Sequence, residues 1–143
     1  MIVLDTNVLS ELMRPNPEQA VIAWMDRQDP ATLFLTAITV AEILYGIARL
    51  PEGKRKAGLR ELGAAVLNED FAGRIISFDE TAAGCYADVV CERQRSGRPI
   101  SMADAQIAAI CRTLKGVTLA TRNSLDFEGI GLDLTNPWTD RQA

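Results

Sequence analysis

Short apolar runs alternate with longer helix-periodic segments along the whole chain, and this alternation constrains the fold more than any other feature. The expected strands are Ile2–Asp5, Leu33–Thr36, Arg74–Phe78, Val117–Thr121 and Leu132–Thr135. The expected helices are one starting near Asn7, then Glu18–Arg27, Thr39–Arg49, Lys54–Leu67, one capped by Asp79 that runs to Arg95, and one from Ser101 to Gly116. Strands that alternate with helices favour a parallel sheet covered on both faces. We therefore predict an α/β fold with a central parallel sheet of four to five strands in a single domain, residues 1–143.

Composition supports an ordinary intracellular domain. The chain has 143 residues, and 48% of them are apolar, which is enough to build a packed core. No apolar run approaches the roughly 20 residues that span a bilayer, and the N-terminus lacks the basic region of a signal peptide. We therefore expect a cytoplasmic protein without a membrane partner. Cys85, Cys91 and Cys111 are odd in number and form no C-x-x-C pair, so we expect buried, reduced thiols rather than disulfides or a zinc site.

Three acidic residues stand where an apolar run gives way to a helical segment. Asp5 ends the first expected strand, Glu42 follows Thr39 at the start of one helix, and Asp104 follows Ser101 at the start of another. In an open parallel sheet, the ends of the strands and the beginnings of the following helices gather at one edge. Acids that are far apart in the sequence can therefore share one pocket.

Each of these acids also has a structural interpretation. Thr39-x-x-Glu42 fits a capping box, in which the glutamate satisfies a backbone donor at the helix start, and Ser101-x-x-Asp104 is a weaker version of it. Asp5 likewise suits the N-cap of the next helix. Acids that share one pocket repel each other unless a positive group lies between them. Their common position therefore favours a bound divalent cation over three independent caps.

The types of ligand select the metal and the chemistry. The chain has no histidine, and a carboxylate cluster without histidine or convergent cysteines suits Mg²⁺ or Mn²⁺ rather than zinc or copper. The absence of histidine also excludes a histidine-based ribonuclease and a Ser-His-Asp hydrolase. Metal-activated water remains, and its natural reaction is phosphodiester hydrolysis.

The charge distribution bears on the substrate. A net charge of −4 argues against a simple nucleic-acid-binding surface. The basic residues are nevertheless clustered, at Lys54, Arg55, Lys56 and Arg60 and again at Arg93, Arg95 and Arg98. Each cluster fits a solvated helix face or a helix C-terminus that favours cations. The alternative is a basic rim in which Lys54, Arg55 and Lys56 contact nucleic-acid phosphates.

Four segments occur in a set order along the chain: Val3–Leu9 (VLDTNVL), Thr39–Ile43 (TVAEI), Ser101–Ala108 (SMADAQIA) and Thr118–Asn123 (TLATRN). Together they resemble the four motifs of PIN-domain ribonucleases, in particular VapC-type toxins of bacterial toxin–antitoxin pairs. The resemblance implies a parallel sheet flanked by helices and Mg²⁺- or Mn²⁺-dependent RNA cleavage. It also implies a homodimer and inhibition by a small antitoxin protein that binds DNA.

The resemblance assigns roles to individual residues. Asp5, Glu42 and Asp104 match the acidic residues of the family, so they are the expected metal ligands and catalytic residues. Thr6 would form hydrogen bonds that orient the site, and Asn7 would fix the turn.

One position departs from the family pattern. Where many members carry a fourth acid after Thr-Arg, this chain has Asn123, which offers an oxygen but no charge. Asp126 is a candidate replacement, and the alternative is an ordinary solvated acid beside Phe127. Arg122 is expected either to contact an RNA phosphate or to pair with one of the acids.

Two functions of different classes follow from these residues. The first is a metal-dependent endoribonuclease that acts as a toxin. The second is a catalytically weak PIN-like module that binds RNA or a protein, which Asn123 and the acidic total charge favour. A phosphatase with Asp5 as nucleophile fits poorly, because such enzymes need a second acid where this chain has Asn7. The three acids favour the enzyme.

Overall fold

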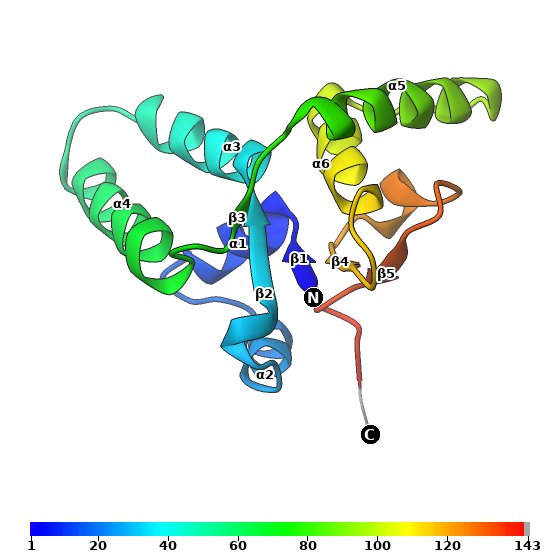
Figure 1. Cartoon of the computed structure of the whole chain (residues 1–143). Helices are drawn as coiled ribbons and strands as arrows, with labels where there is room; N and C mark the ends of the chain where they lie inside the picture. Colours follow the sequence, from blue (N-terminus) through cyan, green and yellow to red (C-terminus); the bar gives the residue numbers. More distant parts are fainter. Residues whose placement is uncertain (142–143) are drawn as a thin grey trace.

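The computed structural model describes residues 1–141, in which five parallel strands form one sheet in the order β3-β2-β1-β4-β5 (Figure 1). The strands are β1 (Ile2–Leu4), β2 (Leu33–Thr36), β3 (Ile75–Ile76), β4 (Thr118–Ala120) and β5 (Asp133–Thr135). Every pair of neighbouring strands is parallel. The predicted parallel α/β sheet is confirmed, with β1 at its centre.

Helices connect the strands and cover the sheet. They are α1 (Thr6–Leu12), α2 (Gln19–Asp26), α3 (Ala37–Ala48), α4 (Lys54–Ala65), α5 (Glu80–Arg95) and α6 (Met102–Arg112). Shorter helical segments are η1 (Pro30–Thr32), η2 (Val66–Asp70) and η3 (Ser124–Phe127). Among residues 1–141, no helix combines the length and the apolar character that crossing a membrane requires.

The sheet separates two apolar cores. Val3 and Leu4 are both fully buried but point to opposite faces, because successive side chains alternate along a strand. Leu4 packs in the cluster under α1 to α4, whereas Val3 packs in the cluster under α5 and α6. In Figure 1, α3 and α4 accordingly lie on one side of the sheet and α5 and α6 on the other. Both faces of the sheet are therefore closed to water, and its carboxyl edge remains for a site.

Helix α3 begins earlier than the capping-box interpretation predicted. Thr36 is its N-cap, and the Thr36 Oγ1 accepts a hydrogen bond of 3.1 Å from the backbone N–H of Thr39. Glu42 therefore lies in the second turn of α3, where it cannot close a box with Thr39. The capping-box interpretation of these two residues is wrong, because a threonine at the end of β2 already caps the helix.

Helices α3 and α4 pack against each other as a helical hairpin, and Lys56 connects them. Lys56 is only 6% exposed, although it belongs to the basic stretch at the start of α4. Its Nζ donates to the carbonyl oxygen of Ala48 at 2.9 Å and pairs with Glu52 Oε1 at 2.7 Å. Lys56 thus ties α4 to the C-terminal end of α3.

The three cysteines are free thiols. Cys111 is buried in α6, where burial raises its pKa to about 12, and Cys85 is half-buried. Cys91 is exposed on α5, so the prediction of three buried thiols is wrong at this position.

Candidate active site

Three acids meet at the carboxyl edge of the sheet. Asp5 directly follows the central strand β1 and caps α1, Glu42 comes from α3, and Asp104 comes from the first turn of α6. The strand order places β1 between β2 and β4, so the segments that follow these strands surround Asp5. The structure therefore places the three acids that the sequence singled out at the same edge of the sheet.

Asp5 is a buried carboxylate held by several donors. It is 4% exposed. Its Oδ1 accepts a hydrogen bond of 2.8 Å from the backbone N–H of Thr6. Its Oδ2 accepts one of 2.7 Å from Thr121 Oγ1 and a longer one of 3.3 Å from Asn7 Nδ2. These contacts fix the orientation of the carboxylate.

The acids influence one another electrostatically. Burial raises the pKa of Asp5 to about 6, although the hydrogen bonds from Thr121 and Thr6 lower it, and the charges of Asp104 and Glu42 raise it further. Burial also raises the pKa of Asp104. The Ser101 hydroxyl and the positive charge of Arg93 oppose this rise, whereas the negative charges of Asp126 and Glu42 add to it. The acids therefore share one environment that favours a positive ligand.

Thr6 links two of the acids. Its backbone N–H binds Asp5, and its hydroxyl donates a hydrogen bond of 2.7 Å to Glu42 Oε1. The same hydroxyl lies 3.1 Å from Thr39 Oγ1. Thr6 therefore orients Glu42 relative to Asp5, in agreement with the hydrogen-bonding role that the resemblance implied.

Asn7 joins the start of α1 to the turn after β4. Its Oδ1 accepts a hydrogen bond of 3.2 Å from the backbone N–H of Arg122. Its Nδ2 lies 3.3 Å from Asp5 Oδ2 and 3.4 Å from Thr121 Oγ1. Asn7 thus fixes this turn against the acid cluster.

The turn after β4 presents two further side chains. Asn123 is exposed, and its backbone N–H donates to Thr121 Oγ1 at 3.1 Å. Asp126 is also exposed, in η3, yet its charge contributes to the raised pKa of Asp104. The neighbouring Phe127 is 1% exposed and anchors the turn in the core. Asp126 is therefore close enough to act electrostatically on the cluster.

Arg122 does not pair with an acid in the described part of the chain. Its guanidinium carbon lies 5.0 Å from the centre of the Trp138 ring, in a cation–π contact. Trp138 itself packs against the core under α1 to α4. Arg122 consequently keeps an exposed cation beside the turn that Asn7 fixes.

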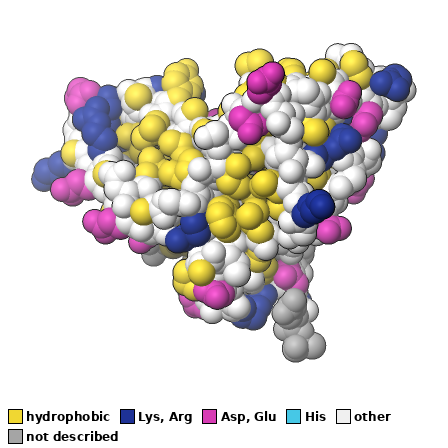
Figure 2. Space-filling model, viewed as in Figure 1, with side chains coloured by type: hydrophobic (Ala, Val, Ile, Leu, Met, Phe, Trp, Pro, Cys, Tyr) yellow, Lys and Arg dark blue, Asp and Glu magenta, His cyan; other side chains and the backbone are white. Residues whose placement is uncertain are grey.

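A cavity of about 630 Å³ opens beside the acids, between α1, α3 and α4. Thr6 and Glu42 are among the residues that line it. The rest of its lining is mostly apolar, and hydrophobic side chains gather on this face over α3 and α4 (Figure 2). Arg14, Lys54 and Arg55 also line it, so the cavity carries positive charge next to an acidic site. The structure does not bring Lys56 to this cavity.

The donor set fits a hard divalent cation. All candidate ligands are carboxylate, amide or hydroxyl oxygens, which suit Mg²⁺ or Mn²⁺. Within residues 1–141, no three acids, cysteines or histidines stand close enough to bind one ion directly. An ion at this edge would therefore be held directly by at most two of the carboxylates and through water by the third, as is common for Mg²⁺.

Comparison with known proteins gives the family. The sequence profile of the PIN domain family matches residues 2–130. The chain belongs to the PIN domain family. This PIN domain is 45% identical to the VapC ribonuclease Y4jK of Sinorhizobium fredii over 138 residues, which cover 96% of this chain and 98% of that protein. It is 41% identical to the toxin FitB of Neisseria gonorrhoeae over 140 residues, covering 98% and 100%.

Solved structures agree with this family assignment. The structure of FitAB bound to an IR36 DNA fragment superimposes with a TM-score of 0.92 at 40% identity, covering 99% of both chains. The resemblance to PIN-domain toxins that the four motifs predicted is therefore confirmed.

Thr121 is a site residue that the sequence did not reveal, although it stands within the segment that resembles the fourth PIN motif. The register of the sheet pairs Leu4 with Ala120. The following residues, Asp5 and Thr121, consequently lie side by side. The only sequence signal was a hydroxyl residue directly after β4, which becomes informative once β4 is known to neighbour β1.

Proposed function

We propose that this PIN domain is a metal-dependent endoribonuclease, the toxin of a type II toxin–antitoxin system. Asp5, Glu42 and Asp104 are its catalytic and metal-binding residues. The observation that carries the proposal is the buried Asp5 carboxylate, whose pKa is raised by burial and by two neighbouring acids. The names of the relatives, a VapC ribonuclease and a FitB toxin, support the activity and the biological role.

Mg²⁺ or Mn²⁺ is the proposed cofactor. When bound, such an ion lowers the pKa of a water molecule and offsets negative charge on the phosphoryl group. The residues of the chain supply the rest of the chemistry. Thr6, Asn7 and Thr121 hold the Asp5 carboxylate in one orientation, and Thr6 also holds Glu42.

Asp126 is the proposed fourth acid. Asn123 stands where many family members have an acid, so the charge at that position is missing. The electrostatic effect of Asp126 on Asp104 supports a compensating role, and Asn123 is left as a neutral oxygen donor at the rim.

Basic residues around the acids are the proposed RNA contacts. Lys54 and Arg55 line the cavity beside Glu42, and Arg122 lies on Trp138 beside the turn after β4. Phosphate contacts by such residues position a nucleic acid without reading its sequence. Lys56 is left out of this proposal because its ammonium group is buried and bound to Ala48 and Glu52.

The proposed partners are a cognate antitoxin and a second copy of the chain. The FitAB structure with DNA supports an antitoxin partner. The apolar cavity offers that antitoxin a surface contiguous with Glu42, from which it would also block RNA. Leu44 and Tyr45 are 48% and 68% exposed on α3, and such apolar side chains suit a homodimer contact. We place the protein in the cytoplasm, where RNA is available.

Cleavage of RNA by the purified chain tests the proposal. We expect cleavage with Mg²⁺ or Mn²⁺, no cleavage in excess EDTA, and no cleavage by an Asp5→Asn variant that still binds RNA. Undiminished cleavage in EDTA contradicts the metal mechanism.

The second candidate is a catalytically weak module that binds RNA or a protein. Asn123 and the net charge of −4 favour it. It predicts that the wild-type chain binds RNA with no metal-dependent cleavage, and that Asp5→Asn changes neither property.

A further inference from the structure

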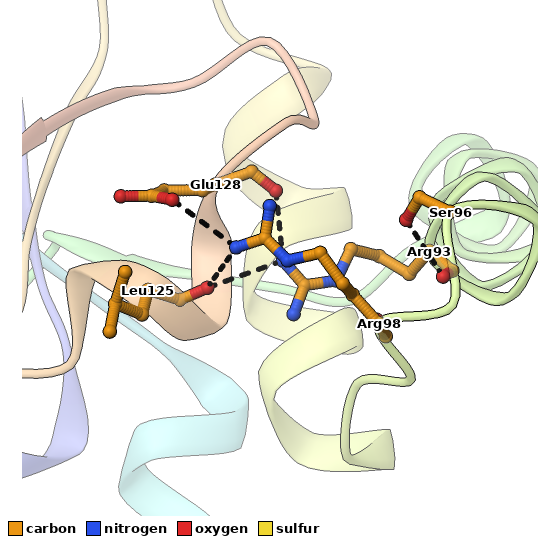
Figure 3. Close-up of polar contacts among 5 residues, drawn as sticks. All are labelled: Arg93, Ser96, Arg98, Leu125 and Glu128. Carbon is orange, nitrogen blue, oxygen red and sulfur yellow. Dashed lines mark hydrogen bonds and ion pairs between the residues drawn. The ribbon is translucent and has the colours of Figure 1, made fainter.

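Arg93 and Arg98 both form polar contacts with Leu125 and Glu128, as Figure 3 shows. Asp126 lies between these two residues in the sequence. Arg93, in the last turn of α5, donates from Nη1 to the carbonyl oxygens of Glu128 at 2.8 Å and Leu125 at 3.4 Å. Arg98 donates from Nη2 to the same Leu125 carbonyl at 3.1 Å and pairs with Glu128 Oε2 at 3.2 Å. Both guanidinium groups therefore converge on residues 125 to 128.

The two arginines are also tied to each other. Arg93 Nε donates to the carbonyl oxygen of Arg98 at 2.6 Å, and the backbone N–H of Arg98 donates to the carbonyl of Arg93 at 2.9 Å. The Ser96 hydroxyl binds the Arg93 carbonyl at 2.9 Å. These hydrogen bonds fix the loop at the end of α5 and hold both guanidinium groups against residues 125 to 128.

Arg93 is too deeply buried to be an ordinary solvent-exposed cation. It is 5% exposed, and no carboxylate of residues 1–141 pairs with it. Its buried charge is compensated by the carbonyl oxygens of Arg98, Leu125 and Glu128. These include carbonyls at the end of the short helix η3, which have no partner within the helix itself. Burying a cation is costly, so this arrangement commits Arg93 to the turn.

Asp126 lies within the segment, residues 125 to 128, that the two arginines contact. Its neighbour Leu125 accepts hydrogen bonds from both arginines, and its other neighbour Phe127 is buried in the core under α5 and α6. The backbone of Asp126 is therefore fixed on both sides, and its own N–H donates to the Asn123 carbonyl at 3.0 Å. Only the side chain remains free, on a short helix that contacts α6, the helix of Asp104.

We propose that Arg93 and Arg98 are positioning residues of the acid site, which fix residues 124–128, the segment that carries the Asp126 carboxylate and contacts α6. Arg98 acts on the site through Asp126, next to Asn123, which brings no charge. Arg93 fixes the same segment, and its positive charge also acts directly on Asp104. This inference rests on the proposed function.

Amide hydrogen exchange on the metal-free protein tests the first half of the proposal. Arg98→Gln removes the ion pair with Glu128 and a hydrogen bond to Leu125, at a position exposed enough to be tolerated. We expect faster exchange confined to residues 124–128. Arg95→Gln is the matched control, because Arg95 lies in the same turn of α5 as Arg93 but is exposed. Equal exchange in the two variants overturns the proposal.

Mn²⁺ titration of the full chain tests the second half. Loss of a residue that orients a metal ligand weakens affinity about tenfold or more, and we expect about tenfold for Arg98→Gln and no change for Arg95→Gln. Asp126→Asn should weaken affinity to a similar extent. Adding Arg98→Gln to Asp126→Asn should then have no further effect, because the route through Asp126 is already lost.

Other outcomes separate the failure of this inference from the failure of the proposed function. An equal further loss of Mn²⁺ affinity in the Asp126→Asn background overturns the route through Asp126. Wild-type Mn²⁺ affinity in both Arg98→Gln and the more conservative Arg93→Lys overturns the positioning role of the two arginines, but leaves the metal site intact. If the wild type binds no Mn²⁺, or if Asp104→Asn binds Mn²⁺ as tightly as the wild type does, the proposed function fails. The positioning role of Arg93 and Arg98 then fails with it.

Discussion

Thr121 Oγ1 donates a hydrogen bond of 2.7 Å to Asp5 Oδ2, and this contact joins the residues that directly follow the neighbouring strands β4 and β1. Thr121 is fully buried and Asp5 is 4% exposed. A carboxylate that has lost its water remains charged only where donors replace that water. Thr121 is the donor whose hydrogen bond lowers the pKa of Asp5 most. The sheet register therefore places beside Asp5 the donor that most favours its charged form.

Replacement of Thr121 by valine should destabilise the metal-free fold. Valine keeps the shape of the side chain but removes the donor, and hydrogen bonds to charged groups contribute roughly 1.5 to 3 kcal/mol. We expect Thr121→Val to lower the free energy of unfolding at pH 7.5 by about this amount, measured with urea. Thr121→Ser keeps the hydroxyl and is the control. Equal stability of the two variants would show that the contact with Asp5 is not energetically important.

The metal-free protein should lose stability as pH rises from about 4 to about 6. The folded-state pKa of Asp5 is about 6, above its ordinary value of 3.8. Across this window the folded state holds a proton that the unfolded state has released, so deprotonation favours unfolding. The two-unit difference corresponds to on the order of 3 kcal/mol. Urea melts in EDTA at several pH values measure it.

Asp5→Asn is the control for this pH dependence, because asparagine does not titrate. Its stability profile should be flatter than that of the wild type, with a residual slope of the same sign from Asp104, whose pKa is also raised by burial. A wild-type stability that increases between pH 4 and pH 6 would contradict a buried, destabilised Asp5 carboxylate.

The positions of strands and acids could be predicted because they depend on local pattern. Alternating apolar and helical segments located all five strands, and the ordered motifs located Asp5, Glu42 and Asp104. The start of α3 was misplaced because both Thr36 and Thr39 are good N-cap residues, and only the end of β2 decides between them. The local pattern alone was compatible with either threonine.

The roles of basic residues could not be predicted, because they depend on tertiary contacts. Lys54 and Lys56 are two residues apart in one basic stretch, yet one lines the cavity and the other is buried against Ala48. Arg93 and Arg95 differ in the same way at the end of α5. Residues two positions apart on a helix face different directions, and composition does not reveal which face is covered.

Variants of Ser101 and Asp104 should distinguish the residue that caps α6 from the residue that binds the metal. Ser101 caps α6 by accepting a hydrogen bond of 3.2 Å from the backbone N–H of Asp104, so Ser101→Ala should cost the metal-free protein about 1 kcal/mol. Asp104→Asn should cost little or even stabilise the metal-free form, because it relieves repulsion in the cluster.

Mg²⁺ should reverse this order. A bound ion stabilises the wild type by mass action, by about 2.7 kcal/mol at 100 times its dissociation constant. Ser101→Ala should retain most of this gain and Asp104→Asn should lose it. Thermal melts with and without Mg²⁺ are sufficient, and equal metal-induced shifts in the two variants would remove Asp104 from the metal site.

The salt dependence of RNA binding should distinguish Lys54 and Arg55 from Lys56. Each phosphate contact on single-stranded RNA contributes about 0.7 to the slope of log affinity against log salt. If Lys54 and Arg55 each bind a phosphate, the double alanine variant should flatten this slope by about 1.4 when binding is measured in EDTA. Arg60→Ala, on the same helix but outside the cavity lining, should leave the slope unchanged.

Lys56→Met should also leave the salt slope unchanged, but it should lower the free energy of unfolding by about 1 kcal/mol, because the Ala48 carbonyl loses its donor. An unchanged slope in the double variant would return Lys54 and Arg55 to a solvated helix face, and a flatter slope in Lys56→Met would show that its buried ammonium group reaches RNA after all.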